Sequence, residues 1–387
     1  MNITIAIDSF KGSLSSLEAG EAVALAAKEV FCDATVAVSP LADGGEGTMD
    51  AIVSALGGEI CSLDVTGPLG ETVTARYAVV KERSLAVIEM AEAAGLTLVP
   101  SEKRDPKITT TYGVGELIMH AAEVENCRSF IVCIGGSATS DGGVGMLTTL
   151  GFEFLDKNGD PIRSGAIGLA DIATVRCESV PTSVRESTFK IACDVDNPLC
   201  GPLGAAYVYG PQKGDDENDV RLIDECLSHY ASVTAKTLGE DKRNADGAGA
   251  AGGMGFAFLS YLSGELRSGV ELVAEAISLE DKVKSADLVI TGEGRLDGQS
   301  ARGKAPVGVA RIARKCGKTC IAFSGCVGDG AEDCNGEGID AYFPIIQLPC
   351  SLDEAMNTDI ARKNLKNTAK QVFNLIKAMK GYSVVES

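Results

Sequence analysis

The 387-residue sequence contains no tryptophan and only two histidines, His120 and His229. Both histidines lie in segments with a helical pattern, outside the glycine-rich loops described below. A structural role is the simplest interpretation of each, which argues against a histidine-based catalytic triad or proton shuttle. If the protein is an enzyme that needs a general base, we expect that base to be a carboxylate.

The sequence also lacks a C-x-x-C motif and long apolar runs. Its 13 cysteines are odd in number, and several lie inside apolar runs, as is typical of buried reduced thiols in a cytosolic protein. No apolar run approaches the roughly 18 residues that a membrane span needs, and the N-terminus resembles a strand rather than a signal peptide. We therefore expect a cytoplasmic protein with no membrane partner.

Basic residues are few, since 35 lysines and arginines face 54 acidic residues and the formal net charge is −19. Nucleic acids and anionic membranes are bound by basic faces, so we expect neither as a partner. An anionic substrate would have to be held by a few local cations or by metal ions.

Glycine, in contrast, is abundant, with 45 residues. Much of it lies in four segments in which a short apolar run leads into a loop and then a helical pattern: 2–15, 35–48, 129–143 and 286–304. In an open parallel sheet such loops meet at the carboxyl ends of the strands, and their backbone N–H groups suit an anion. The carboxylates in the same loops would repel an anion unless a cation lies between them. The pattern predicts a metal–phosphate site in an enzyme that acts on a phosphorylated ligand.

The alternation of strand-like and helical segments predicts an α/β fold with two domains. We expect a Rossmann-like domain with a parallel sheet, formed by residues 1–61, 105–150 and 286–387. Residues 62–104 and 151–285 then form a second α/β domain with a mixed sheet, inserted into the first. The strands near Ser129 and Lys190 fit either domain.

The first two loops carry charged candidates for a site. Asp8 follows the first strand, where it suits a metal ion or substrate hydroxyls, and Lys11 suits a carboxylate or a phosphate. The alternative is an ordinary aspartate turn with an exposed lysine. Asp43 and Glu46 lie three positions apart on a turn that begins a helix, although one of them could simply cap that helix.

The later loops add further candidates. Residues 135–143 have the composition of a phosphate nest or of a tight glycine-rich turn. Asp194 lies where a strand gives way to a proline and suits a base or a metal ligand. Arg295 offers a bidentate fork for a carboxylate or phosphoryl group, and Lys304, before a helix, suits a phosphate. The Lys304 segment follows the Walker A pattern until Ala305 replaces the final Ser or Thr, so we do not expect a P-loop.

Eight motifs in chain order resemble those of the bacterial glycerate kinase family of glycerate and glucarate catabolism: DSFKGSLS, ADGGEGT, DVTGPLG, IGGSATSDGG, CDVDNPL, YGPQKG, GAGAAGG and ITGEGRLDGQS-x-x-GKAP. The resemblance covers essentially the whole chain. The sequence departs from the family's motifs at two positions: Gly298 replaces an expected serine, and Arg302 lies at a variable position. Neither residue is given a role below. The resemblance implies phosphorylation of D-glycerate with ATP and Mg²⁺, at the 2-hydroxyl, to give 2-phosphoglycerate and ADP. It also implies an active site in the cleft between two domains, and we expect a monomer or a homodimer.

Phosphoryl transfer depends mostly on positioning and charge. The implied reaction therefore needs residues that bind Mg²⁺, residues that bind D-glycerate and residues that bind the nucleotide. The carboxylates that we expect to bind Mg²⁺ are Asp43, Glu46 and Asp141. The residues that we expect to bind D-glycerate, with the two cations on its carboxylate, are Asp8, Lys11, Ser13 and Arg295. The groups that we expect on the nucleotide side are Gly135, Gly136, Ser137 and Glu293, with Lys304 on the transferred phosphoryl group.

The attacking hydroxyl needs a proton acceptor within about 3 Å. We expect Asp194 to be this base, with Asp297 as the second candidate. Two alternatives stay open: phosphorylation at the 3-hydroxyl, and a non-catalytic protein that binds a nucleotide or a sugar acid. A Rossmann dehydrogenase is not expected, since the first turn lacks G-x-G-x-x-G.

Overall fold

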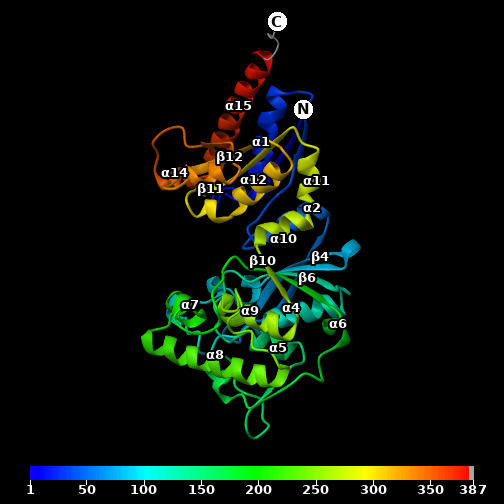
Figure 1. The fold of residues 1–387 in the computed structure, drawn as a ribbon, viewed down its shortest axis with the longest axis vertical. Helices are drawn as coiled ribbons and strands as arrows, with labels where there is room; N and C mark the ends of the chain where they lie inside the picture. The colour runs from blue at the N-terminus through cyan, green and yellow to red at the C-terminus, as the bar shows by residue number, and fades with distance from the viewer. Residues whose placement is uncertain (383–387) are drawn as a thin grey trace. The chain divides into compact units, whose positions relative to one another are not determined.

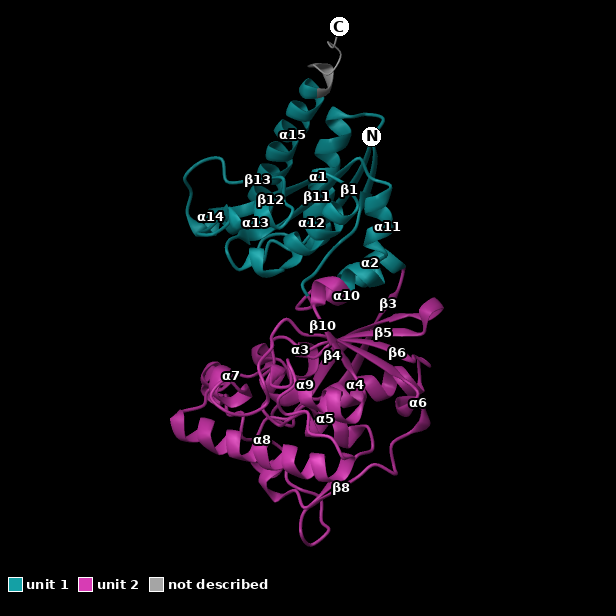
Figure 2. Ribbon diagram, in the orientation of Figure 1, with its two compact units in different colours: residues 1–43, 50–56, 273–387 teal, residues 44–49, 57–272 magenta. Residues whose placement is uncertain are grey.

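The computed structural model describes residues 1–382, which form two compact units (Figure 1, Figure 2). Unit 1 comprises residues 1–43, 50–56 and the chain from residue 273 onward, and unit 2 comprises residues 44–49 and 57–272. In the described part of the chain, none of the helices has both the length and the apolar character that a membrane span requires.

Unit 1 is built on a parallel five-stranded sheet with the strand order β13-β12-β11-β1-β2. The strands are β1 (Asn2–Ile7), β2 (Thr35–Val38), β11 (Leu288–Leu296), β12 (Cys320–Val327) and β13 (Ala341–Pro344). Counted within unit 1 alone, they follow the doubly wound order 2-1-3-4-5, in which the strand order reverses between β1 and its neighbour β11. The predicted Rossmann-like parallel sheet is confirmed.

The helices of unit 1 are α1 (Ser16–Val30), α11 (Leu279–Lys284), α12 (Ala305–Lys315), α13 (Asp333–Gly336), α14 (Leu352–Met356) and α15 (Thr358–Tyr382). Two further helices, α2 (Thr48–Leu56) and α10 (Gly269–Ala276), have residues in both units. Helices α1 and α15 pack together on the face of the sheet that carries Ile3 and Ile5, and α12 packs on β11 and β12. Helix α1 begins with the capping box of Ser15 and Glu18, in which each side chain binds the other residue's backbone N–H.

Unit 2 contains a mixed six-stranded sheet with the strand order β10-β9-β6-β5-β4-β3. The strands are β3 (Glu59–Thr66), β4 (Thr72–Val80), β5 (Leu85–Glu89), β6 (Ser129–Cys133), β9 (Thr188–Ala192) and β10 (Glu265–Arg267). The β3–β4 and β4–β5 pairs are antiparallel, and the remaining pairs are parallel. The predicted mixed sheet is confirmed.

The other elements of unit 2 surround this sheet. A small antiparallel sheet pairs β7 (Glu153–Leu155) with β8 (Thr174–Arg176). The helices are α3 (Ala91–Ala94), α4 (Tyr112–Glu123), α5 (Val144–Thr149), α6 (Thr182–Arg185), α7 (Ala205–Lys213), α8 (Glu217–Leu238) and α9 (Ala250–Tyr261). Side chains from the sheet and from α4, α8 and α9 form one continuous apolar core, so unit 2 has a core of its own.

The boundaries of the two units differ from the predicted domains in four segments. Residues 44–49 and 57–61, predicted in the Rossmann-like domain, lie in unit 2. Residues 105–150, predicted in the Rossmann-like domain, lie in unit 2, because β6 pairs with β5 on one side and β9 on the other. Residues 273–285, predicted in the inserted domain, lie in unit 1. An apolar run followed by a glycine-rich loop has the same local pattern in either sheet, and only the pairing partners of β6 decide its place.

Candidate active site

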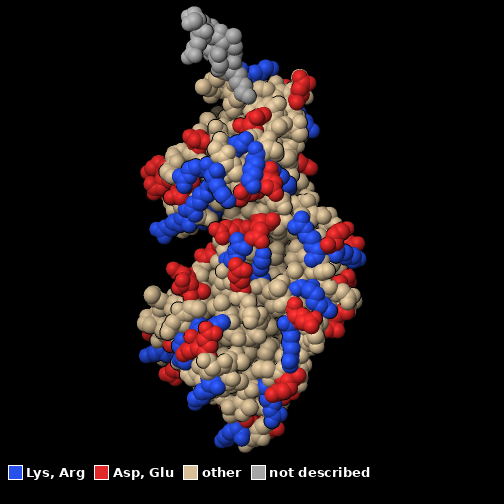
Figure 3. Space-filling view, turned by 45° about the vertical axis from the view of Figure 1, so that its right-hand side comes forward, with Lys and Arg blue, Asp and Glu red and all other residues tan. Residues whose placement is uncertain are grey.

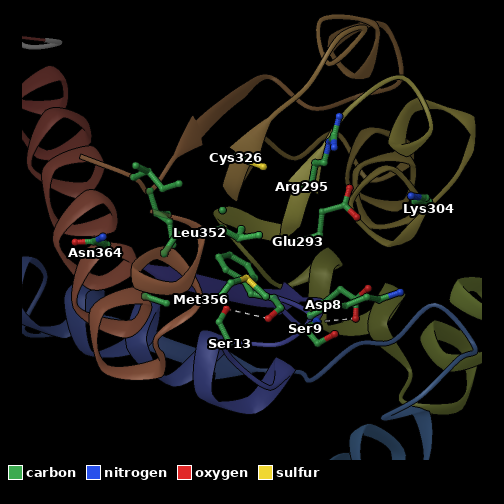
Figure 4. Close-up of a pocket in the computed structure, with 18 of the residues that line it drawn as sticks. Asp8, Ser9, Ser13, Glu293, Arg295, Lys304, Cys326, Leu352, Met356 and Asn364 are labelled. Carbon is green, nitrogen blue, oxygen red and sulfur yellow. Dashed lines mark hydrogen bonds between the residues drawn. The ribbon is translucent and has the colours of Figure 1, made fainter. Parts of the chain in front are cut away.

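A cavity of about 410 Å³ lies in unit 1 at the carboxyl ends of β1 and β11 (Figure 4). All of its lining residues belong to unit 1. The charged ones are Asp8, Lys11, Asp43, Glu293, Arg295 and Lys304. Doubly wound sheets bind ligands at the point where the strand order reverses, so this cavity is the candidate active site of unit 1.

Asp8 directly follows β1 and is only 5% exposed. Its Oδ1 accepts a hydrogen bond from the Ser9 N–H at 2.6 Å, and its own N–H donates to the Gly292 carbonyl in β11 at 2.9 Å. Burial, together with the nearby Asp43 carboxylate, raises the pKa of Asp8 to about 7. Asp8 therefore titrates near neutral pH, and a cationic neighbour would stabilise its ionised form.

Lys11 forms an ion pair with Asp43, with Nζ 3.2 Å from Oδ2. Burial of part of the side chain lowers the pKa of Lys11, but Asp43 and the other carboxylates outweigh it, and the net shift is upward. The Lys11 side chain is 75% exposed, and exposed pairs of this kind contribute little to stability. The ammonium group therefore stays charged. Breaking its ion pair with Asp43 to bind an anionic ligand would cost little free energy.

Glu293 lies in β11 and is buried. Burial raises its pKa, although a hydrogen bond donated by the Ser300 hydroxyl and the charge of Lys304 act in the opposite direction. Lys304 is the residue before α12, and its Nζ donates to the Gln299 side-chain oxygen at 3.3 Å. A lysine at a helix N-terminus adds its charge to the free backbone N–H groups there, which is an arrangement suited to a phosphate.

Arg295 is the third cation of the cavity, and it is paired with Asp297, with Nε 3.2 Å from Oδ2. The other oxygen of Asp297 accepts hydrogen bonds from the N–H groups of Gln299 and Ser300 at 2.9 and 3.4 Å. Both oxygens of Asp297 are therefore engaged, and the residue does not line the cavity. This arrangement suits a residue that orients Arg295 better than a free general base.

The structure brings seven of the predicted site residues to this cavity: Asp8, Lys11, Ser13, Asp43, Glu293, Arg295 and Lys304. The Ser13 hydroxyl donates to the Phe10 carbonyl at 2.9 Å, which closes the turn after β1. The remaining predicted residues, apart from Asp297, belong to unit 2: Glu46, Gly135, Gly136, Ser137, Asp141 and Asp194.

Asp141 has surroundings that differ from those expected of a Mg²⁺ ligand. It is 2% exposed, and its Oδ2 accepts from the Thr111 N–H, the Thr111 hydroxyl and the Gly145 N–H at 2.8, 2.9 and 3.2 Å. Its Oδ1 accepts from the Gly143 N–H at 3.1 Å. Burial raises the pKa of Asp141, and these hydrogen bonds act against that rise. Four protein donors leave the carboxylate satisfied without a cation, so it fixes the glycine-rich loop.

The other predicted residues of unit 2 lie on backbone turns or at the surface. The Gly136 carbonyl accepts from the Leu96 N–H at 2.8 Å, and Ser137 forms an isolated bridge with Gly95, so this loop is held against the segment after α3. Asp194 is exposed, and its Oδ1 accepts from the Gly269 N–H at 3.1 Å. Glu46 is also exposed.

The donor set of the cavity fits a magnesium ion bound together with phosphates. Within the described residues, no three His, Cys, Asp or Glu side chains lie together as a ready-made metal site. Mg²⁺ is usually held by one or two carboxylates and completes its shell with substrate phosphates and water. Asp8 and Asp43 meet this requirement, because Asp43 raises the pKa of Asp8 and a divalent cation would remove that repulsion.

One part of the cavity carries no signal in the sequence. Leu352 and Met356 of α14 and Asn364 of α15 line it, and they belong to a closing helical segment without glycine or charged motifs. Ser300, which donates a hydrogen bond to the buried Glu293, likewise has no local signal of this contact. A serine seven positions after a glutamate has no recognisable spacing, and only the turn after β11 brings the two together.

A family model described as the glycerate kinase family matches residues 3–377. The chain is 46% identical over 354 residues to a glycerate kinase of Halalkalibacterium halodurans, which covers 92% of this chain and 93% of the relative. It is 45% identical over 355 residues to the glycerate 2-kinase of Escherichia coli, with the same coverage of 92% and 93%. A crystal structure of a protein from Salmonella typhimurium LT2, assigned as glycerate kinase 2, has a TM-score of 0.91 and 42% identity and covers 98% of this chain and 99% of that one.

Proposed function

The chain belongs to the glycerate kinase family, and on that premise we propose that it transfers the terminal phosphoryl group of ATP to the 2-hydroxyl of D-glycerate. The products are 2-phosphoglycerate and ADP. The observation that carries this proposal is the similarity to glycerate kinases over nearly the whole chain, including the Escherichia coli glycerate 2-kinase. We further propose that the protein works in the cytoplasm, as a monomer or a homodimer.

The residues of the unit 1 cavity divide the work of phosphoryl transfer, which depends on positioning and on stabilising charge. Lys304 and the free N–H groups at the start of α12 are proposed to hold phosphate oxygens. Asp8 and Asp43 would hold Mg²⁺, which when bound neutralises charge on the phosphates. Lys11 and Arg295 are proposed to bind the carboxylate of D-glycerate, since both residues line the cavity and both side chains are largely exposed.

Asp194 remains the proposed general base. Asp297, the second candidate, has both carboxylate oxygens in hydrogen bonds or an ion pair and does not line the cavity. Asp194 is exposed, so a substrate hydroxyl can reach its side chain. The Gly135–Ser137 backbone remains a proposal for the nucleotide side, and Glu46 for the metal.

A coupled assay of ADP release with D-glycerate tests the activity, and ³¹P and ¹³C NMR of the product test the position of the phosphate. We expect ADP release that requires D-glycerate, and a phosphate on C2. A phosphate on C3 would overturn the regiochemistry. Binding of nucleotide without ADP release from any small hydroxy acid would support the non-catalytic alternative. Light scattering after size-exclusion chromatography determines the oligomeric state.

A further inference from the structure

The unit 1 cavity has two parts of different chemistry (Figure 4). One part holds the charged residues of the candidate site. The other is lined by apolar side chains that include Phe10, Ile345, Ile346, Leu352, Ala355 and Met356. In the close-up, Leu352 and Met356 lie between Asn364 and the charged residues Asp8 and Glu293. D-Glycerate is a small polar acid without an apolar face, so neither it nor a phosphate accounts for this apolar part.

The apolar wall is fixed beside the loop that carries Lys11. Helix α14 begins with a capping box of Ser351 and Glu354. The Thr358 hydroxyl, at the start of α15, donates to the Ser13 carbonyl at 2.9 Å. Gly12 adopts a φ of +82°, and a Cβ at this position would overlap the methyl group of Met356. Glycine at position 12 therefore lets the α14 wall and the Lys11 loop form one continuous surface.

Two side chains of this wall are exposed although they line a cavity. Leu352 is 75% exposed and Met356 is 37% exposed. Covering such apolar surface is favourable, at roughly 25 cal/mol per Å² removed from water. A ligand with a flat apolar face would gain this energy, and the methionine thioether packs well against an aromatic ring.

Asn364 supplies the polar group that such a ligand needs. It lies on α15, is half-buried and lines the cavity next to Ala361, and its side-chain amide makes no hydrogen bond with any of the described residues. A primary amide offers a donor and an acceptor side by side. Adenine presents an amino donor beside a ring-nitrogen acceptor, and asparagine pairs with that edge through two hydrogen bonds.

We propose that the apolar part of the cavity binds the adenosine of the nucleotide, with the base packed on Leu352 and Met356 and its polar edge paired with Asn364. This inference rests on the proposed function, which supplies ATP as the phosphoryl donor. It places the phosphates on the Lys304 side of the same cavity. A volume of about 410 Å³ is in the range of sites for small ligands.

The test measures binding without turnover, by titration calorimetry of Mg–ADP and of Mg–pyrophosphate. Asn364→Ala should weaken ADP binding by about 5- to 30-fold, as expected for the loss of one or two hydrogen bonds, and should leave pyrophosphate binding unchanged. The matched control is Asn367→Ala, which removes an exposed asparagine of the same helix that does not line the cavity.

A second pair of variants tests the apolar wall. Leu352→Ser should weaken ADP binding by about 3- to 10-fold, because it removes roughly a side chain's worth of apolar contact from the base. Leu348→Ser is its control, because Leu348 is 76% exposed, nearly the same as Leu352, but does not line the cavity. Circular dichroism melting curves of all four variants check that they fold like the wild type.

The outcomes separate this inference from the proposed function. Suppose that the wild type phosphorylates D-glycerate but that Asn364→Ala and Leu352→Ser bind ADP as tightly as their controls. This result would overturn the adenosine site and leave the proposed function standing. A wild-type chain that binds ADP through these residues but releases no ADP with D-glycerate keeps the adenosine site and overturns the proposed function. Equal weakening of ADP and pyrophosphate by Asn364→Ala also contradicts the inference, since it would place Asn364 on the phosphate side.

Discussion

Asp8 is a buried carboxyl of the cavity with a pKa near neutral pH. Burial and the Asp43 carboxylate raise its pKa to about 7, so the group is largely protonated below pH 7 and ionised above it. A Mg²⁺ ion at Asp8 must displace that proton. We therefore expect the apparent affinity for Mg²⁺ to fall, by up to about tenfold per pH unit, as the pH drops below 7.

Initial rates with D-glycerate and ATP, measured at a series of Mg²⁺ concentrations at pH 6 and pH 8, give this affinity. Asp8→Asn should bind Mg²⁺ more weakly at pH 8 and should lose the part of the pH dependence that the wild type owes to Asp8. The variant also controls for the protonation of ATP itself, which is the same in both proteins. Identical pH dependence in the wild type and in Asp8→Asn would contradict the assignment.

The same raised pKa predicts an effect on stability. An aspartate in an unfolded chain ionises near pH 3.9, whereas Asp8 in the folded protein ionises near pH 7. Between about pH 4 and 7 the folded state binds more protons than the unfolded state does. The free energy of unfolding therefore falls as the pH rises through this range. Without Mg²⁺ we expect Asp8→Asn to exceed the wild type in free energy of unfolding by about 1–3 kcal/mol at pH 8, and by less at pH 5. Urea unfolding at the two pH values measures this, and an equal difference at both would exclude titration of Asp8 as the cause.

Asp194 can be tested as the base by a substitution that keeps its shape. Asp194→Asn should lower kcat by about 10²–10⁴-fold and change the KM for D-glycerate little, because the proton acceptor is lost while binding groups remain. Asp297→Asn is the comparison: it should instead raise the KM for D-glycerate, because Asp297 is paired with Arg295. If Mn²⁺ or high Mg²⁺ restores Asp194→Asn to near wild-type rates, Asp194 is a metal ligand and not the base.

At the scale of elements, two motifs that were given no role, YGPQKG and GAGAAGG, meet the glycine-rich loop of residues 135–143 inside unit 2. Lys213, at the end of α7, is fully buried and its Nζ donates to the Thr139 carbonyl at 2.5 Å. Gly252 of α9 adopts a φ of +68°, and its carbonyl accepts from the Gly142 N–H at 3.0 Å. Burial lowers the pKa of Lys213 to about 8. The glycine-rich loop is therefore held from two sides by helices distant in sequence.

Gly252 gives a measurable prediction for this junction. A Cβ at Gly252 would overlap the Thr139 carbonyl oxygen and lie 2.7 Å from the Ser140 Cα, so Gly252→Ala adds a backbone clash to the strain of a positive φ. We expect a loss of about 2–4 kcal/mol in the free energy of unfolding. The control, Gly239→Ala, has a φ of +81° with nothing within 4 Å of the added Cβ, and it should cost only about 1 kcal/mol. Equal losses of unfolding free energy in the two variants would show that the strain of a positive φ, and not the clash with Thr139, destabilises Gly252→Ala.

The elements also show what the sequence could predict and what it could not. The capping box at Ser15 and the charged loops that carry Asp8 and Lys304 have local signals, and the structure brings both loops to one cavity. Which sheet contains β6 depends on pairing with strands far away in sequence. Asp141 resembles a metal ligand in a glycine-rich loop, yet its hydrogen bonds to Thr111 come from a distant helix terminus. The apolar wall of the cavity likewise exists only because α14 folds back over Gly12.

At the scale of the whole molecule, the proposed function requires a protein of negative net charge to bind anionic ligands. The formal net charge is −19, and Figure 3 shows acidic and basic side chains interspersed over the visible face. Over distances beyond the Debye length of about 8–10 Å, salt screens such exposed charges. Binding of ATP should therefore depend on the few cations that line the cavity and not on the overall charge.

Two lysine substitutions that change the net charge equally separate the effect of the cavity cations on ATP binding from the effect of the overall charge. Lys304→Met removes a cation that lines the cavity, and Lys236→Met removes an exposed lysine of α8 in unit 2. We expect Lys304→Met to raise the KM for ATP by roughly 10- to 100-fold, as for one charge-assisted hydrogen bond of about 1.5–3 kcal/mol, and Lys236→Met to change it less than twofold. Steady-state kinetics at 50 mM and 500 mM salt would show a smaller effect of Lys304→Met at the higher salt concentration, because salt screens the charge of the half-buried Lys304. If both variants raise the KM to the same extent, the net charge of the molecule controls nucleotide binding, and Lys304 has no special contact with the phosphates.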